Sequence, residues 1–285
     1  MRGFLNKMRV ALAEPVDYFL RLSDDELHLN PIIGHRIRLT FHGNIQCQHC
    51  GNATRKSYSQ GYCYPCFKRL AQCDLCVVSP ERCHFSEGTC REPEWGERFC
   101  MQPHVVYLAN SSGIKVGITK PEQIPTRWID QGAVQAIPVV SVDTRQQSGF
   151  VEVAFKQHIT DRTHWQRMLQ ADDPHVDMMA ERDRLLQELA PDLDRLREQF
   201  GMQSIREIRD AETQVLRYPV DRYPTRVVAM NFDKTPTIEA VLLGIKGQYL
   251  VFDDGVINLR RYTSYEIEFE DKGHVTDVGE SLSLF

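Results

Sequence analysis

The hydrophobic and polar positions of the chain change their period several times, and each change predicts a different kind of element. Near the N-terminus, residues 16–22 alternate in part and residues 37–42 alternate cleanly, which is typical of strands with one buried face. Residues 1–46 therefore indicate an extended, β-rich segment. Because this segment contains no catalytic pattern, we interpret it as a strand pair that covers another part of the protein.

A mixed pattern begins at residue 104 and continues to about residue 165. Two apolar runs, 105–109 and 114–119, flank the turn-forming sequence Asn110–Gly113 and predict a β-hairpin. The same region predicts a short helix after Pro125 that ends at Gly132, a strand over 137–142 and a helix over 149–158.

From residue 174 to residue 200 the apolar spacing becomes helical. Pro191 begins a second helical stretch, and Gly201 stands where a helix would stop. The apolar stripes consist of Val176, Met179, Leu185, Leu186 and Leu189 in the first stretch, and of Leu193, Leu196 and Phe200 in the second. Charged residues of both signs fill the remaining positions, as on a solvated surface.

Strand patterns return near the C-terminus. Lys246-Gly247 and Asp253–Gly255 are hairpin turns between short apolar runs. The predicted strands cover residues 226–230, 240–243, 248–252, 256–259 and 265–269. Five short strands joined by tight turns favour a small barrel or sandwich. The last dozen residues are polar, and we expect them to fray.

Composition and charge narrow the class of protein. The 285 residues are 42% hydrophobic and 26% charged, as in ordinary globular proteins with two or three modest domains. The formal net charge of −5 argues against a surface that is basic all over, but it allows a local basic groove. No apolar run reaches the ~20 residues of a membrane span and no secretory pattern occurs, so we expect a cytoplasmic protein.

All nine cysteines lie between Cys47 and Cys100, and in a reducing compartment such clustering indicates metal ligands rather than disulfides. Two Cys-x2-Cys pairs, Cys47/Cys50 and Cys63/Cys66, are separated by twelve residues. Two intervening residues allow both sulfurs of a tight turn to reach one ion at about 2.3 Å. These four cysteines therefore predict a structural zinc ion in a knuckle of the treble-clef or zinc-ribbon kind.

The remaining cysteines leave a second metal centre less determined. A second zinc ion held by Cys73, Cys76, Cys83 and Cys90 is our first interpretation. An iron–sulfur cluster is the alternative, because it also requires thiolates and five candidates compete for four places. Cys100 is either a substitute ligand or a free thiol. Four thiolates leave no open coordination position, so we do not expect either centre to carry out chemistry.

An ordered set of residues between positions 104 and 165 resembles the core of the GIY-YIG nuclease superfamily. The matching residues are Val105-Val106-Tyr107 for the first tripeptide, Lys115-Val116-Gly117 for the second, and then Thr119, Arg127 and Glu152. The resemblance implies a divalent-metal-dependent endonuclease. Two positions depart from the motif: Val105 replaces a glycine, and Lys115 replaces a tyrosine, as it does in phage-type branches of the superfamily.

Phosphodiester cleavage gives each of these residues a possible role. A carboxylate such as Glu152 can anchor a magnesium or manganese ion that offsets phosphate charge. Arg127 can stabilise the charge of the transition state, and Tyr107 can position or deprotonate water, with Lys115 beside them. Simpler explanations exist for each residue: Tyr107 as a core aromatic, Arg127 with Glu152 as a surface ion pair, and Lys115 as a solvent-facing cation.

Aromatic residues beside cations suggest contact with DNA or RNA. Trp128 follows Arg127, and Trp165 and Arg167 lie further along the chain. Tryptophan rings can stack on bases while arginine holds the backbone. Core tryptophans with surface arginines are the alternative. Taken whole, the cysteine-rich front, the hairpin and residues 126–133 also resemble a bacterial protein family, a resemblance that implies no activity.

We therefore predict an α+β protein with a metal-stapled knuckle block, a small mixed α/β domain that is GIY-YIG-like, and a small β-barrel or sandwich built from terminal strands. The predicted boundaries are 1–46 for the N-terminal β segment, 47–100 for the metal-binding block, 101–213 for the GIY-YIG-like domain with its helical extension, 214–271 for the C-terminal β domain and 272–285 for a tail. The first functional hypothesis is an endonuclease. The second is a catalytically inactive, zinc-containing module that binds nucleic acid or the ribosome, and the third is a scaffold for another protein.

Overall fold

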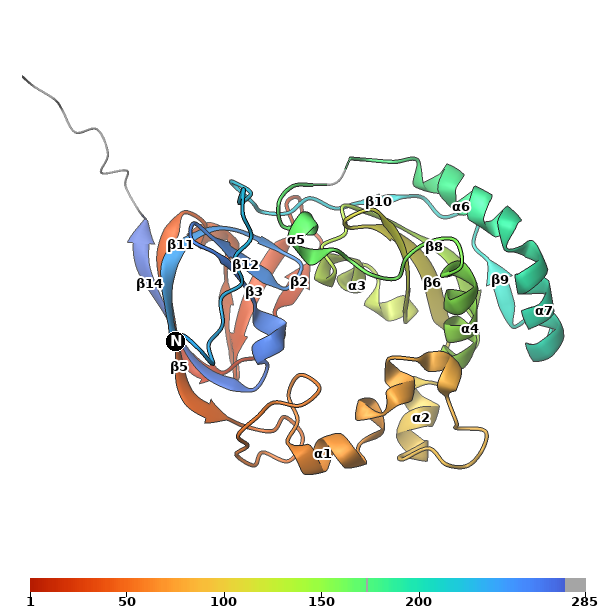
Figure 1. Ribbon diagram of the computed structural model, residues 1–285, viewed down its shortest axis with the longest axis horizontal. Helices are drawn as coiled ribbons and strands as arrows, with labels where there is room; N and C mark the ends of the chain where they lie inside the picture. The colour runs from red at the N-terminus through yellow and green to blue at the C-terminus, as the bar shows by residue number, and fades with distance from the viewer. Residues whose placement is uncertain (173, 275–285) are drawn as a thin grey trace, which may run out of the picture.

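The computed structural model describes residues 1–172 and 174–274, and within them the protein is an α+β structure with three antiparallel sheets. In Figure 1 a six-stranded sheet lies at the left and a five-stranded sheet at the right, while the cysteine-rich segment runs below and between them. Residues 275–285, which include most of the expected tail, lie outside the described residues. No helix in the described part of the chain is long and apolar enough to cross a membrane.

Strands from both ends of the chain share the six-stranded sheet. Its order is β1-β14-β5-β11-β12-β13, with the bounds β1 (Arg2–Phe4), β14 (Tyr265–His274), β5 (His35–Ile45), β11 (Thr237–Lys246), β12 (Tyr249–Phe252) and β13 (Val256–Asn258). The central strand β5 pairs with β14 on one side and with β11 on the other, so that Leu39 lies between Phe269 and Ile238. This part of the fold depends on contacts between residues about 200 positions apart.

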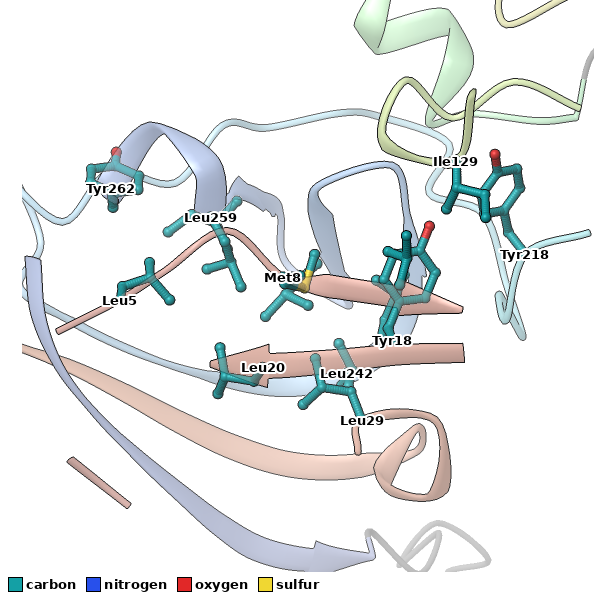
Figure 2. Close-up of a cluster of buried hydrophobic side chains, with 14 of the residues drawn as sticks. Leu5, Met8, Tyr18, Leu20, Leu29, Ile129, Tyr218, Leu242, Leu259 and Tyr262 are labelled. Carbon is teal, nitrogen blue, oxygen red and sulfur yellow. The ribbon is translucent and has the colours of Figure 1, made fainter. Parts of the chain in front are cut away.

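A three-stranded sheet covers one face of the larger sheet. Its strands are β2 (Arg9–Ala11), β3 (Asp17–Leu22) and β4 (Asp25–His28). Alternation in β3 buries Tyr18, Leu20 and Leu22 completely, as expected for a strand with one apolar face. Figure 2 shows Leu20 beside Leu242 of β11, in a core cluster that continues to Ile129 and therefore reaches the other half of the molecule.

The five-stranded sheet carries the predicted hairpin and lies between two packed layers. Its order is β10-β8-β6-β7 with β9 also paired to β8, and the bounds are β6 (His104–Asn110), β7 (Ile114–Thr119), β8 (Gln135–Val142), β9 (Ile205–Glu207) and β10 (Gln214–Val215). Every residue of β6 is buried. Val106 and Leu108 face a cluster with the helices, whereas Tyr107 and Ala109 face the cluster that includes the larger sheet.

Seven α-helices occur in the described residues, and α4, α6 and α7 contribute to the helix side of this core. Their bounds are α1 (Tyr64–Arg69), α2 (Pro93–Phe99), α3 (Thr126–Asp130), α4 (Arg145–Phe155), α5 (Trp165–Met168), α6 (Met178–Glu188) and α7 (Ala190–Phe200). Gly201 follows α7 with φ +107°, so the predicted helix stop is confirmed.

Three local predictions were wrong. Residues 226–230 form no strand, because they make only a bridge from Ala229 to Val256 at the edge of the larger sheet. Val176 precedes α6, and Met179 is 44% exposed, because the buried face of α6 is set by Met178 and Leu185 instead. Helix α4 begins four residues earlier than expected.

The early start of α4 has a clear cause. The side chain of Thr144 accepts a hydrogen bond from the backbone of Gln147, and the Gln147 side chain accepts one from the backbone N–H of Thr144. This reciprocal arrangement is a capping box, which satisfies two backbone donors at a helix N-terminus. Arg145 is thereby placed in the same helix as Glu152.

Candidate functional site

The cysteines at positions 47, 50, 63 and 66 converge as the sequence predicts. Their sulfur atoms all lie within 4.8 Å of one another, and the sulfurs of Cys50 and Cys63 are 3.7 Å apart. Four thiolates around one zinc ion at about 2.3 Å have sulfur–sulfur separations of about 3.8 Å. The cluster is therefore compatible with a structural zinc ion.

Local backbone structure explains this convergence. Gly51 has φ +71° and donates its N–H to the carbonyl of Cys47, which closes the first turn. Cys63 caps helix α1 and Cys66 lies in its first turn, so both sulfurs are at a helix N-terminus. Burial opposes ionisation of Cys47, but the N–H groups of Cys50, Cys63 and His49 lower the pKa of its thiol to about 6. A thiolate is the form that binds metal.

The other cysteines do not lie as the sequence suggested. Cys73 packs with the first cluster, beside Cys47 and Cys66. By contrast, Cys76, Cys83, Cys90 and Cys100 line a small cavity of about 10 Å³. Donor atoms of Asp74, Cys76 and His84 also lie within 4.8 Å of one another at this cavity.

The hairpin brings the two tripeptides of the motif into direct register. Tyr107 of β6 pairs with Gly117 of β7. Tyr107 is fully buried, and its hydroxyl donates a hydrogen bond of 3.0 Å to Oε1 of Gln131. A side chain at position 117 could not be accommodated, because its Cβ would lie 2.6 Å from the Tyr107 hydroxyl. The glycine therefore leaves room for the tyrosine.

Arg127 and Glu152 line one cavity beside β7, the last strand in the order β10-β8-β6-β7, although they come from helices on opposite faces of the sheet. Both line one open cavity of about 240 Å³, together with Gly117, Gln131 and Arg145. Arg127 belongs to α3, and Glu152 belongs to α4. The cavity thus collects two carboxylates (Glu152 and Asp161), two guanidinium groups, the ammonium of Lys156 and an amide at the position where β7 has no side chain.

Glu152 lies in an electrostatic environment of mixed sign. Burial raises the pKa of its carboxyl group, and the neighbouring Lys156 opposes that rise. The Lys156 ammonium lies 3.3 Å from a Glu152 oxygen and 2.8 Å from an Asp161 oxygen. The lysine therefore bridges two carboxylates at the edge of the cavity, a position that a divalent cation could also take.

Lys115 is not the solvent-facing residue of the simpler explanation. It is 4% exposed, and its ammonium donates a 2.7 Å hydrogen bond to the hydroxyl of Thr163. Burial and then the positive charge of Arg127 lower the pKa of Lys115 to about 8. Its side chain supports the segment beside β7 and does not line the cavity.

A larger groove of about 910 Å³ adjoins the cavity and shares Arg127 and Arg145 with it. Its cationic lining residues within the described chain are Lys7, Arg21, Lys120, Arg127, Arg145 and Arg260. The carboxylates that face them there are Glu122 and Asp130. A chain with a net charge of −5 has therefore gathered positive charge along one groove.

The predicted stacking residues lie elsewhere. Trp128 is 3% exposed and packs edge-on against Tyr107 in the core, so its ring is not available to a base in this structure. Trp165 is half-buried and stacks on Tyr249 with ring centroids 5.8 Å apart. Arg167 is exposed on the same short helix. None of the three lines the groove.

Gln131 and Arg145 are site residues that the sequence interpretation missed. Gln131 is adjacent to the predicted helix stop at Gly132, so its contact with Tyr107 depends on the tertiary fold. Arg145 had a sequence signal, because the Thr144–Gln147 capping box places it at the start of α4. Its guanidinium donates to the carbonyl of Val77 in the cysteine block.

The cysteine block is fastened to the start of α4. The backbone N–H of Arg145 donates to the carbonyl of Cys100, and the Gln146 side chain donates to the carbonyl of Cys83, each at 2.8 Å. Gly149 allows the closest approach, since a Cβ there would lie 2.4 Å from the backbone nitrogen of Glu81. The helix that carries Glu152 therefore rests on the cysteine block.

Comparison with known proteins assigns the chain to a family. Residues 34–267, most of its length, match the family described as "Protein of unknown function (DUF2797)". The chain belongs to the DUF2797 family. No curated protein and no solved structure shows a significant match. The DUF2797 description names no activity, so function has to be argued from the geometry of the site.

Proposed function

We propose that this DUF2797 protein is a divalent-metal-dependent phosphodiesterase that cleaves nucleic acid. The observation that carries the proposal is the meeting of Arg127 and Glu152, two residues of the GIY-YIG-like motif, at one open cavity. The simpler explanation, an ion pair between the two residues, is not what the described residues show, because the carboxylate of Glu152 pairs with Lys156.

The chemistry divides among the residues of the cavity. Glu152 would anchor a magnesium or manganese ion, which keeps most of its water ligands and neutralises the phosphate. Arg127 would stabilise the charge of the pentavalent state. Tyr107 is too buried to touch a substrate, so we assign it the positioning of Gln131, whose amide faces the cavity and can orient the attacking water.

The adjoining groove supplies a binding surface for a polyanion. Cations concentrated in a concave surface attract a phosphate backbone and release its counterions. Lys120 and Arg145 both lie over the ring of Phe99, at 4.5 Å and 5.9 Å from its centroid, which combines an aromatic surface with positive charge. A strand of DNA or RNA held in the groove would place phosphates beside Arg127, where the groove and the cavity meet.

The test is cleavage of labelled DNA and RNA with magnesium or manganese, and with a chelator. We expect Glu152→Gln to abolish cleavage while binding and folding stay intact, because a neutral amide anchors the ion poorly. Glu198→Gln, on the exposed face of α7, is the matched control and should cleave like the wild type. Lys156→Met should lower the metal concentration needed for half-maximal cleavage, because the ammonium no longer competes for Glu152.

Two results would refute the proposal. One is a wild-type protein that cleaves neither DNA nor RNA with either metal, and the other is a Glu152→Gln variant that cleaves as fast as the wild type. Binding without cleavage would favour the second candidate, an inactive nucleic-acid-binding module. That candidate has its own support, since Tyr107 is completely buried and Lys156 already neutralises Glu152.

A further inference from the structure

The small cavity in the cysteine block has the size of a single ion. Its volume of about 10 Å³ is close to that of one water-sized sphere. Asp74, Cys76 and His84 all line it, and their donor atoms lie within 4.8 Å of one another. Ligand atoms of one tetrahedral zinc ion lie about 3.3–3.8 Å apart. The 3.6 Å between Nε2 of His84 and Oδ2 of Asp74 falls in that range.

The ring of His84 is oriented for metal binding. Its Nδ1 lies 2.7 Å from the hydroxyl of Thr89, and that hydroxyl donates to the carbonyl of His84 at 3.3 Å. Because the hydroxyl proton is used in this way, the hydroxyl accepts from Nδ1, which must carry the ring N–H. The lone pair is then on Nε2, the nitrogen nearer to Asp74. Metal-ligating histidines are usually held by such a hydrogen bond from their other ring nitrogen.

Asp74 is held in place and keeps the capacity to bind an ion. It accepts a hydrogen bond from the backbone of Leu75 and pairs with Nε of Arg91, each at 2.6 Å. A carboxylate has about four lone-pair sites, so two such bonds leave others available. The 3.6 Å to Nε2 of His84 is too long for a hydrogen bond. Two acceptors therefore face each other, which a cation between them would stabilise.

We propose that Asp74, Cys76 and His84 hold a second zinc ion at this cavity. Carboxylate oxygen, thiolate sulfur and imidazole nitrogen are all ligand types that zinc takes. Cys76 releases its proton when it binds the ion, so the thiolate and the carboxylate together balance the two positive charges. The fourth tetrahedral position faces the space that Cys83, Cys90 and Cys100 also line, so a further thiolate is available to close it.

The surroundings suit a buried structural ion. Phe85 and Trp95 line the cavity, and Gly96 of α2 lets them approach. A Cβ at Gly96 would lie 2.8 Å from the Phe85 ring and 3.3 Å from the Cys90 sulfur. A hydrophobic shell of this kind limits solvent access to a metal. Cys73, a ligand in the sequence-based prediction, is not one here because it packs with the first cluster. The inference does not depend on nucleic-acid cleavage.

The experiment measures zinc per chain in the full-length protein and the affinity of each ion by chelator competition. We expect two zinc ions in the wild type. Thr89→Val removes the hydroxyl that holds His84, and since Thr89 is exposed the fold should tolerate the change. It should weaken one ion by about 10–100-fold in Kd and leave the other unchanged. Ser86→Ala, exposed in the same loop, is the matched control and should bind both ions like the wild type.

Direct removal of a ligand gives the second test. His84→Gln should lose one zinc ion and keep the other, whereas His175→Gln, at an exposed histidine before α6, should keep both. Three outcomes would overturn the inference. A wild type that binds one zinc ion at saturating zinc has no second site. Unchanged affinities in Thr89→Val, or two zinc ions in His84→Gln, would show that His84 is not a ligand. The first outcome is read from the wild-type protein and does not depend on the folding of any variant.

Discussion

Replacing Gly117 with alanine tests whether the two motif tripeptides pack as the structure shows. The new Cβ would lie 2.6 Å from the hydroxyl and 2.7 Å from Cζ of Tyr107. Tyr107 has little freedom to retreat, because it is fully buried, packs against Trp128 and donates a hydrogen bond to Gln131. The substitution therefore forces either a shift of β7 or the loss of that hydrogen bond.

The expected cost follows from these contacts. Overpacking a well-filled core typically costs about 1–3 kcal/mol, and losing one neutral hydrogen bond adds about 0.5–1.5 kcal/mol. Alanine is favoured over glycine inside a strand by about 0.5–1 kcal/mol, which offsets part of the loss. We expect the free energy of unfolding to fall by about 1–3 kcal/mol, with a decrease in Tm of about 2–4 °C for each kcal/mol.

Urea unfolding followed by tryptophan fluorescence is a suitable assay, because Trp128 lies 6.0 Å from the Tyr107 ring. A double-mutant cycle with Tyr107→Phe isolates the contact, since it removes the closest atom. The alanine should cost less in the Tyr107→Phe background, with a coupling energy of at least about 0.5 kcal/mol. A Gly117→Ala variant as stable as the wild type, or additive effects in the cycle, would refute the proposed register.

Two further predictions concern the metal block and the acid stability of the protein. Cys50→Ser should release zinc and lower Tm, because metal binding and folding are coupled; Cys73→Ser should not, and metal analysis that finds equal zinc in both would contradict this. Burial lowers the pKa of His104 to about 4, so the unfolded chain takes up a proton between pH 6.5 and 4 that the native protein does not. The free energy of unfolding should therefore decrease as the pH is lowered from 6.5 to 4, by up to about 3 kcal/mol. His104→Phe should remove that part of the decrease, as measured by urea titrations at each pH.

Much of the strand content could be predicted, because a strand that buries only one face has alternating apolar and polar residues in its sequence. Residues 16–22 and 37–42 correspond to β3 and to part of β5. The sequence does not show which strands pair, and β5 pairs with β11 and β14 from the other end of the chain. Residues 226–230 have strand-like composition, but in the structure they run beside the edge of the larger sheet. There Val228 and Met230 share backbone hydrogen bonds with Val256.

Spacing alone could not assign the second set of cysteines. A Cys-x2-Cys pattern at Cys73 and Cys76 suggests one knuckle, as at the first site. In the structure the two residues belong to separate 3₁₀ turns, Ala71–Cys73 and Leu75–Val77, with Asp74 extended between them. The two thiols therefore lie apart: Cys73 packs with the first cluster, whereas Cys76 lines a cavity together with Cys83, Cys90 and Cys100.

The attachment of α4 to the cysteine block affects how any loss of activity should be interpreted. The carbonyls of Cys83 and Cys100 accept hydrogen bonds from the first turn of α4, about two turns before Glu152 in the same helix. Disrupting the block around Cys83 and Cys100 should therefore displace Glu152 and reduce cleavage without any direct role for these cysteines in chemistry. The converse does not hold, because Glu152→Gln changes no contact of the block. A Glu152→Gln protein that keeps the wild-type Tm and zinc content but not activity, beside a Cys100→Ser protein with lowered Tm and lowered activity, would place the chemistry at the cavity and the support of its geometry in the cysteine block.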